Sequence, residues 1–231
     1  MTAPILKLAH VSKDYRGLRP LRIERLEVSP GDRIAIFGLD QTAAEVFVNL
    51  ATGAMLPDRG EVRLFGKPTS SIGNSEEWLT IVDRIGIVSE RAVLLDALSV
   101  VQNLAVPFTL EIQPLSDEIR HRAAALAREV GLPDRSWQQS IGGLDAMARA
   151  RVRLGRALAL DPEILLLEHP TAFMARDDVA MLGRHMRTLA EHRRLAIVAA
   201  TADRTFARAA ADRVLTLRPA TGRLVGSRYF F

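Results

Sequence analysis

The sequence predicts an α/β fold in which helices cover both faces of a parallel sheet. Short apolar stretches bounded by turn residues, such as 85–88 and 164–167, are typical of buried strands. Longer segments with apolar residues at three- and four-residue spacing alternate with these strands, as helices do. The middle of the chain contains helical patterns only, which indicates a helical insertion between two halves of the α/β core.

The elements follow in a regular order along the chain. We expect strands at 5–11, 21–28, 33–37, 61–65, 85–88, 164–167, 195–200 and 213–217. We expect helices at 42–51, 76–82, 103–108, 116–130, 144–160, 177–192 and 204–210. Turn signals at 30–32 and 131–133 separate neighbouring elements.

Composition excludes several classes of protein. The chain has 231 residues, of which 48% are apolar, and this is enough to bury the core of one large domain. It has no cysteine, which excludes disulfides and thiolate chemistry. No apolar run approaches the ~18 residues of a membrane span. Lys7 and His10 interrupt the apolar stretch near the N-terminus, so we expect a cytoplasmic protein without a signal peptide.

Arginine supplies nearly all of the positive charge. Only Lys7, Lys13 and Lys67 are lysines among 31 basic residues, and the formal net charge is +4. The arginines are spread along the chain and interleaved with acidic residues, and few tyrosines or tryptophans are present to stack on bases. We therefore expect a solvated surface rather than a nucleic-acid-binding face.

An apolar strand, a glycine and a helix follow one another at 33–51, as they do around a phosphate-binding loop. That loop has the pattern GxxxxGK[ST], whereas Ala43, Ala44 and Glu45 stand here at its second glycine, lysine and hydroxyl positions. By itself the segment fits an ordinary strand-to-helix turn better than a phosphate-binding loop. The missing lysine and added glutamate oppose the binding of a triphosphate. We expect the Glu45 carboxylate to occupy the helix end in place of phosphate, stabilised by the helix dipole.

The order and spacing of segments over residues 5–226 resemble the nucleotide-binding subunit of ABC transporters, particularly those of lipid and lipoprotein export. The matching segments are LAHVSKDY from Leu8, PGDRIAIFG from Pro30, LPDRGEVRLFGKP from Leu56, LSVVQNLAVPF from Leu98, RVRLGRALALDPEILLLEHPTA from Arg151 and ADRVLTL from Ala211. The resemblance implies one nucleotide-binding domain over 1–231 with a P-loop NTPase-like ABC ATPase core and an antiparallel β lobe. The core would cover about 1–88 and 161–231, and an inserted helical subdomain about 89–160.

ATP and Mg²⁺ are the cofactors that this resemblance implies. The positions that match the family's nucleotide site are Tyr15, Gly38, Leu39, Asp40, Gln41, Thr42, Ala43, Ala44, Glu45, Val46 and Glu90. Tyr15 falls on the aromatic that stacks on adenine, and Glu90 falls on the family's glutamine. Glu168 replaces the Walker B aspartate, which makes it the expected metal ligand and a candidate catalytic residue. His169 replaces the catalytic glutamate.

The other chemical positions of the family are substituted as well. Its LSGGQ signature falls on 144–148 (LDAMA), unless it is shifted to Gly142 and Gly143. The aspartate of the loop after Walker B falls on Ala175, and the switch histidine falls on Ala202. Phosphoryl transfer depends on positioning and charge stabilisation, so the joint loss of these groups predicts a cassette without hydrolysis.

The resemblance also implies partners: an integral-membrane permease, docked near 90–113 at the inner face of the membrane, and a second cassette in a homodimer or heterodimer. We therefore expect a permease-docking subunit with weak or lost nucleotide binding. One alternative is a working ATPase in which Glu168 and His169 substitute for the usual pair. The other is a regulatory or interaction protein that uses the same fold without a permease.

Overall fold

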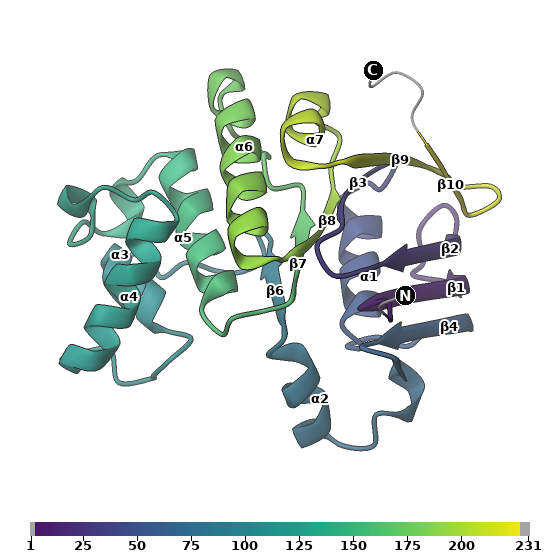
Figure 1. Ribbon diagram of the computed structural model, residues 1–231, viewed down its shortest axis with the longest axis horizontal. Coiled ribbons are helices and arrows are strands. Elements are labelled where there is room, and N and C mark those ends of the chain that lie inside the picture. The colour runs from purple at the N-terminus through teal and green to yellow at the C-terminus, as the bar shows by residue number, and fades with distance from the viewer. Residues whose placement is uncertain (1–2, 227–231) are drawn as a thin grey trace.

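The computed structural model describes residues 3–226 (Figure 1). Residues 1–2 and 227–231 of the expected domain lie outside the described part. The strands are β1 (Leu6–Lys13), β2 (Leu21–Val28), β3 (Arg33–Phe37), β4 (Arg59–Leu64), β5 (Lys67–Pro68), β6 (Ile85–Val88), β7 (Ile164–Glu168), β8 (Ala196–Ala200), β9 (Arg213–Arg218) and β10 (Arg223–Gly226). The helices are α1 (Gln41–Ala51), α2 (Ser75–Val82), α3 (Val100–Ala105), α4 (Asp117–Glu129), α5 (Ala146–Leu158), α6 (Arg176–Arg193) and α7 (Arg204–Ala210).

The strands form two sheets. The larger sheet has the order β10-β9-β3-β8-β7-β6, in which all neighbouring strands are parallel except β10, which is antiparallel to β9. The smaller sheet has the order β2-β1-β4-β5 and is antiparallel. The expected α/β fold, with its parallel sheet and its antiparallel lobe, is confirmed.

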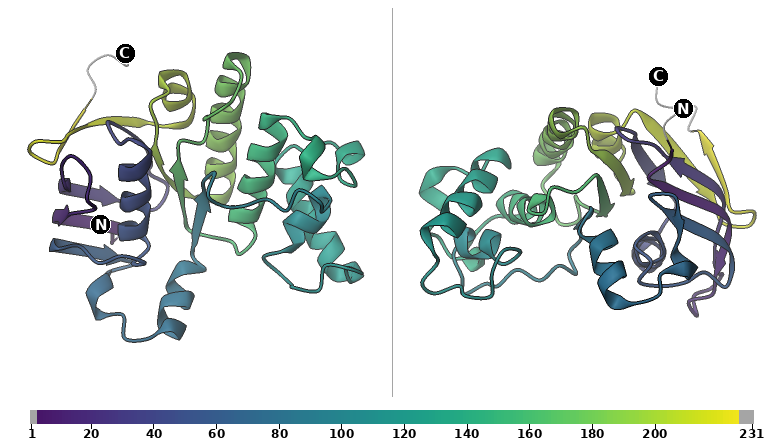
Figure 2. Two further views of the ribbon diagram at one scale, coloured as in Figure 1. Left: turned by 180° about the vertical axis from the view of Figure 1, so that it is seen from behind. Right: turned by 60° about the horizontal axis from the view of Figure 1, so that its bottom comes forward.

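Helices and the smaller sheet cover the two faces of the parallel sheet (Figures 1 and 2). Alternate residues of β7 show this: Leu165 and Leu167 pack in one buried cluster with α3, α4, α5 and α6. Ile164 and Leu166 pack in the other cluster, with α1 and the antiparallel strands. Side chains of a strand point alternately to the two faces, so a strand buried on both faces is continuously apolar, as residues 164–167 of β7 are.

Polar residues fix where most helices begin. Side chains of Asp40, Asn74, Ser99, Ser116, Asp145 and Asp203 accept hydrogen bonds from the first turns of α1, α2, α3, α4, α5 and α7. Such caps satisfy backbone N–H groups that have no partner inside the helix. Ser99 and Gln102 form a full capping box, and α3 therefore begins at Val100, ahead of the expected 103.

The main difference from the expected elements is β10, which the sequence does not predict. Its four residues are too short to show a clear alternation, and it is held by pairing with β9. The turn before β10 also joins the two sheets, because the Glu24 N–H of β2 donates to the Gly222 carbonyl at 2.8 Å. None of the helices in residues 3–226 is long and apolar enough to cross a membrane.

Gly86 sets how closely α5 approaches β6, the strand that leads into the candidate site. A Cβ at this position would lie 2.5 Å from the Ala157 carbonyl oxygen and 2.4 Å from Leu165 Cδ2. We expect Gly86→Ala to lower the free energy of unfolding by ~1–3 kcal/mol, because the backbone of α5 must move.

Urea denaturation measures this loss, and Gly143→Ala is the matched control, since a Cβ there has no neighbour within 4 Å. Equal stability of the two variants would contradict the close packing of α5 on β6.

Candidate functional site

Residues 38–45, which we compared with a phosphate-binding loop, lie in the connection between β3 and α1 and in the first turns of α1. Gly38 leaves β3 with a φ of 90°, a conformation that strains residues with a Cβ. The helix then begins at Gln41. Ala43, Ala44 and Glu45 therefore lie in the first turns of α1 rather than in an open loop.

Asp40 caps α1 in the place where a phosphate-binding loop would offer its amides. Its Oδ1 accepts a hydrogen bond from the Ala43 N–H at 2.8 Å, and its carbonyl oxygen accepts one from the Ala44 N–H at 2.8 Å. Free N–H groups at a helix start are what such loops use to bind phosphate. The expectation that Glu45 closes this helix end is wrong, because Glu45 lies beyond the first turn and pairs with Arg91 instead.

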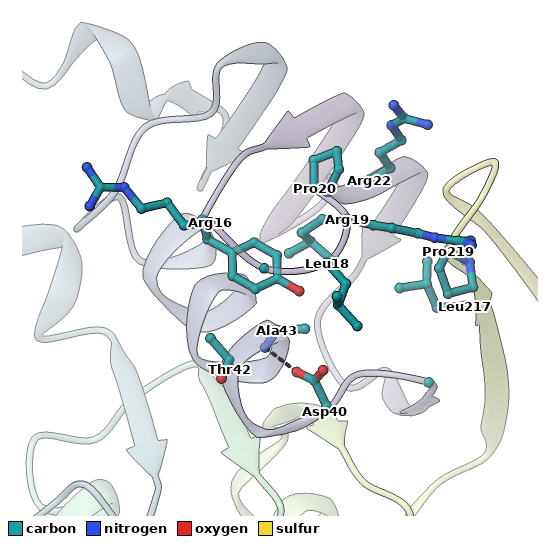
Figure 3. A pocket seen from close by; sticks show the side chains of 14 residues that line it. Arg16, Leu18, Arg19, Pro20, Arg22, Asp40, Thr42, Ala43, Leu217 and Pro219 are labelled. Atoms are coloured by element: carbon teal, nitrogen blue, oxygen red, sulfur yellow. Dashed lines mark hydrogen bonds between the residues drawn. The ribbon is translucent and has the colours of Figure 1, made fainter.

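A cavity of about 600 Å³ lies between this cap and segment 15–22, with Leu217 and Pro219 on the far side (Figure 3). Burial, and to a smaller extent the Asp40 carboxylate, raises the pKa of the Tyr15 phenol in this cavity. The backbone of Gly17 lies against the Tyr15 ring, since an added Cβ would be 2.6 Å from Cε2. Tyr15, the residue expected to stack on adenine, therefore lines a cavity, and the backbone of Gly17 covers part of its ring.

Arginines at the rim of this cavity do not replace the missing lysine. Arg16 and Arg22 point away from Asp40 and Ala43, and Arg19 extends toward Pro219 (Figure 3). Arg22 instead donates a hydrogen bond to the Ala220 carbonyl at 3.2 Å. The charge nearest the start of α1 is therefore the negative one of Asp40, which opposes a phosphate.

A second cluster lies at the carboxyl ends of β6 and β7. The Glu168 side chain is 0% exposed. Its Oε2 accepts hydrogen bonds from Ser89 Oγ at 2.6 Å and from Arg91 Nε at 3.0 Å, and its Oε1 accepts a further bond from Arg91 Nη2. Arg91 Nη1 also lies 3.3 Å from Glu45 Oε1 on α1. One guanidinium thus pairs with carboxylates from two different elements.

This pairing decides whether the cluster fits a divalent cation. The hydrogen bond to Glu168 is the main cause that raises the pKa of Arg91, so the guanidinium remains charged. Glu168 is the expected metal ligand, yet its two oxygens already accept hydrogen bonds from Arg91 and Ser89. Within residues 3–226, no group of three or more potential ligands has the arrangement of a metal site. The residues present do not fit Mg²⁺.

His169, the other candidate catalytic residue, follows Glu168 in a left-handed conformation with φ 43°. Its backbone N–H donates to the Ala200 carbonyl at 2.9 Å. Its ring Nε2 is buried without a hydrogen-bond partner. A general base must reach the water from which it takes a proton, and burial closes the Nε2 of His169 to solvent.

Glu90 points toward the helical part of the chain rather than toward the first cavity. Its carboxylate pairs with Arg153 of α5, with Oε2 at 2.6 Å from Nη2. Arg153 and Arg156 line a groove of about 320 Å³ with apolar residues that include Val106 and Leu160. Burial is the main cause that lowers the pKa values of both guanidinium groups. Arg156 donates to the Val93 carbonyl at 2.7 Å, so α5 holds both ends of segment 90–93.

The signature position repeats the arrangement found at α1. Asp145 caps α5, and its Oδ1 accepts from the Ala148 N–H at 2.7 Å. At the remaining family positions, Ala175 precedes α6 without a side-chain cap, and Ala202 is exposed before α7. The substituted alanines therefore supply no polar group at these two positions.

The structure brings part of the predicted site together. Glu45 and Glu168 meet through Arg91, whereas Val46, Leu39 and Ala44 are buried in the core. Gln41 and Thr42 are exposed on the first turn of α1, and Thr42 also lines the Tyr15 cavity. Sequence reasoning missed Arg91 and Ser89. The only sign of these two residues in the sequence is that they flank Glu90, which falls on the family's glutamine.

Solved structures establish the class of fold. MJ0796, described as a bacterial ABC transporter cassette with a dimeric structure, superposes with a TM-score of 0.78 at 23% identity, covering 97% of this chain and 100% of that one. The cbiO1 protein from Clostridium perfringens, described as part of the ABC transporter complex cbiONQ, gives a TM-score of 0.78 at 23% identity, with coverage of 96% and 87%. The fold is that of an ATP-binding cassette.

Sequence relatives establish the family. The ABC transporter family profile matches residues 21–172. The lipoprotein-releasing system ATP-binding protein LolD of Pseudomonas syringae pv. tomato is 31% identical over 201 residues, which cover 87% of this chain and 86% of that protein. The LolD protein of Psychrobacter arcticus is 29% identical over 218 residues, covering 93% and 96%. The chain belongs to the ABC transporter family.

The closeness of Asp40 to Tyr15 can be tested in solution. We expect Asp40→Asn to lower the pKa of Tyr15 part of the way to its ordinary value, because loss of the negative charge favours the phenolate while burial, the larger cause, remains. Ultraviolet titration in a Tyr229→Phe background reads Tyr15 alone, since the chain has two tyrosines.

Asp203→Asn, which alters the cap of α7, is the matched control and should leave the Tyr15 titration unchanged. An unchanged titration in Asp40→Asn would show that the carboxylate and the phenol do not interact.

Proposed function

We propose that this chain is the cassette subunit of an ABC transport system, that it docks on an integral-membrane permease, and that it does not hydrolyse ATP. The observation that carries the proposal is the capped start of α1. The amides of Ala43 and Ala44 are bonded to Asp40, and the lysine and hydroxyl positions are filled by Ala44 and Glu45. A loop in this state offers phosphate neither the amides of Ala43 and Ala44 nor a cation.

The same change at the signature helix supports the proposal. In the family, two cassettes enclose ATP between the phosphate loop of one and the signature of the other. Here Asp40 and Asp145 each bond an amide at the start of these two helices. Both surfaces that would meet the triphosphate therefore begin with a carboxylate, and the repulsion of like charges opposes binding.

The alternative of a working ATPase depends on Glu168 and His169. Glu168 is occupied by Ser89 and Arg91, and burial closes the Nε2 of His169 to solvent. These contacts support the loss of hydrolysis. The energy for transport would then come from ATP hydrolysis by a different cassette, which is either the partner of this chain in a heterodimer or another subunit of the system.

The groove beside α5 supports the permease assignment, because it combines apolar side chains with two partly buried arginines. Because two relatives are ATP-binding proteins of lipoprotein-releasing systems, we assign the chain to an export system of that class. Docking on a permease would place the protein at the inner face of the membrane. No feature of the groove favours the permease-free alternative.

Rebuilding the phosphate loop tests the nucleotide part of the proposal. The triple change Ala43→Gly, Ala44→Lys and Glu45→Ser restores GxxxxGK[ST], lets the first helical turn unwind and adds two units of positive charge. We expect its affinity for Mg-ATP, measured by calorimetry, to exceed that of the wild type by at least about tenfold, or ~1.4 kcal/mol.

The same triple variant with Ala44→Met is the matched control and should not gain affinity, since it adds chain length without charge. We expect wild-type phosphate release to equal that of Glu168→Gln and His169→Ala. Turnover that these two substitutions abolish would favour the working ATPase instead.

Co-purification tests the docking. Leu160, 47% exposed, lines the groove, so Leu160→Lys should reduce recovery of the permease from detergent-solubilised membranes by about tenfold, because the interface must bury a third cation beside Arg153 and Arg156. Met181→Lys on α6, 42% exposed, is the matched control and should retain the permease. Equal recovery by both variants would place the interface elsewhere.

A further inference from the structure

The Arg91 guanidinium joins β7 and α1 through ion pairs. It comes from the loop after β6, and it pairs with Glu168 at the end of β7 and with Glu45 on α1. Its contact with Glu168 is bidentate, through Nε and Nη2, which is the strongest arrangement available to a guanidinium and a carboxylate. The Arg91 backbone N–H also donates to Ser89 Oγ at 3.1 Å, so the same hydroxyl orients the arginine and the glutamate.

The two partners of Arg91 occupy particular positions of the fold. P-loop ATPases hold Mg²⁺ between the hydroxyl residue of the phosphate loop and the Walker B aspartate. Glu45 stands at the first of these positions and Glu168 at the second. Arg91 therefore contacts the same two positions between which the metal lies in an active P-loop ATPase.

We propose that Arg91 is a built-in replacement for the divalent cation, so that the site stays assembled in the absence of metal and nucleotide. The inference rests on the proposed function, since a chain that hydrolysed ATP would need the metal. A fully buried carboxylate such as Glu168 requires a positive partner, and here that partner is a side chain of the same protein.

The replacement also fixes the loop that carries Arg91. Arg91 binds this loop to β7 and α1, while Arg153 and Arg156 bind its neighbours Glu90 and Val93 to α5. A ligand-bound metal would leave with its nucleotide, whereas an arginine side chain remains. The loop between the sheet and the helices is therefore held permanently.

The test is the response of folding to divalent cations, with no nucleotide present. Arg91→Met removes the charge but keeps much of the side-chain length. It leaves Glu45 and Glu168 without their shared cation, and we expect Tm to fall by about 5–10 °C. Mg²⁺ and Mn²⁺ prefer oxygen ligands such as carboxylates. Either cation should therefore restore part of the lost Tm at constant ionic strength and mildly alkaline pH. The wild type should show no such response.

Two further variants separate a cation site from a purely structural pair. Adding Glu45→Gln to Arg91→Met removes one carboxylate, and the metal response should disappear. Arg84→Met, which breaks the exposed pair with Glu163, is the matched control and should show no response to metal. If Arg91→Met does not fold alone, refolding in Mn²⁺ but not in an equivalent concentration of KCl is the same positive result.

The proposal is overturned if Arg91→Met keeps the wild-type Tm, if its Tm ignores divalent cations, or if it folds under neither condition. It is also overturned if Mg²⁺ raises the wild-type Tm as much as that of the variant. These measurements use no ATP and no permease. A negative result would therefore count against the replacement alone, whereas phosphate release and co-purification test the proposed function separately.

Discussion

The buried carboxylate of Glu168 is the constraint around which the rest of the site is arranged. A charge with no access to water must be paired and hydrogen-bonded, or the fold loses several kcal/mol. Ser89 and Arg91 provide that pairing from the loop after β6, and Glu45 of α1 also pairs with Arg91, so the cluster keeps one net negative charge. Three elements of the core are thereby joined through one side chain. Glu168 stands at the acidic position that binds the metal in an active cassette, and here its carboxylate binds Ser89 and Arg91 instead.

Aspartate has a parallel role at the helix starts. Phosphate binding and side-chain capping compete for the same backbone amides, because both supply negative oxygen to a helix N-terminus. Asp40 and Asp145 resolve that competition in favour of the protein at two separate helices. The cavity beside Tyr15 persists all the same, with Asp40, Thr42 and Ala43 in its wall opposite segment 15–22.

The order of strands and helices could be predicted from the sequence because it depends on local patterns. Continuous apolar runs identified β6, β7 and β8, and Ser116 marked the start of α4 within one residue. Contacts between distant residues could not be predicted in the same way. Arg91 meets Glu168 across 77 positions of the chain, and a sequence rich in arginine gives no local sign of which guanidinium is paired inside.

The error over Glu45 has a similar cause. The sequence predicts that α1 begins at Thr42, which places Glu45 near the first turn. The helix begins at Gln41, so Glu45 lies beyond that turn, and its partner is Arg91, a residue distant in the chain. β10 escaped prediction because the pairing partner, rather than its own four residues, defines it.

The fixed loop at 90–93 has a consequence for how such a subunit can change shape. A ligand shifts a conformational equilibrium only by binding one state more tightly than the other. Under the proposed function, the Ala43 amide is capped and the loop is held by Arg91, Arg153 and Arg156, so a nucleotide would bind two states of this side of the molecule almost equally. A population shift would then arise at a surface shared with another protein. Cause and response would run from partner to cassette, the reverse of the direction in which a hydrolysing subunit drives its transporter.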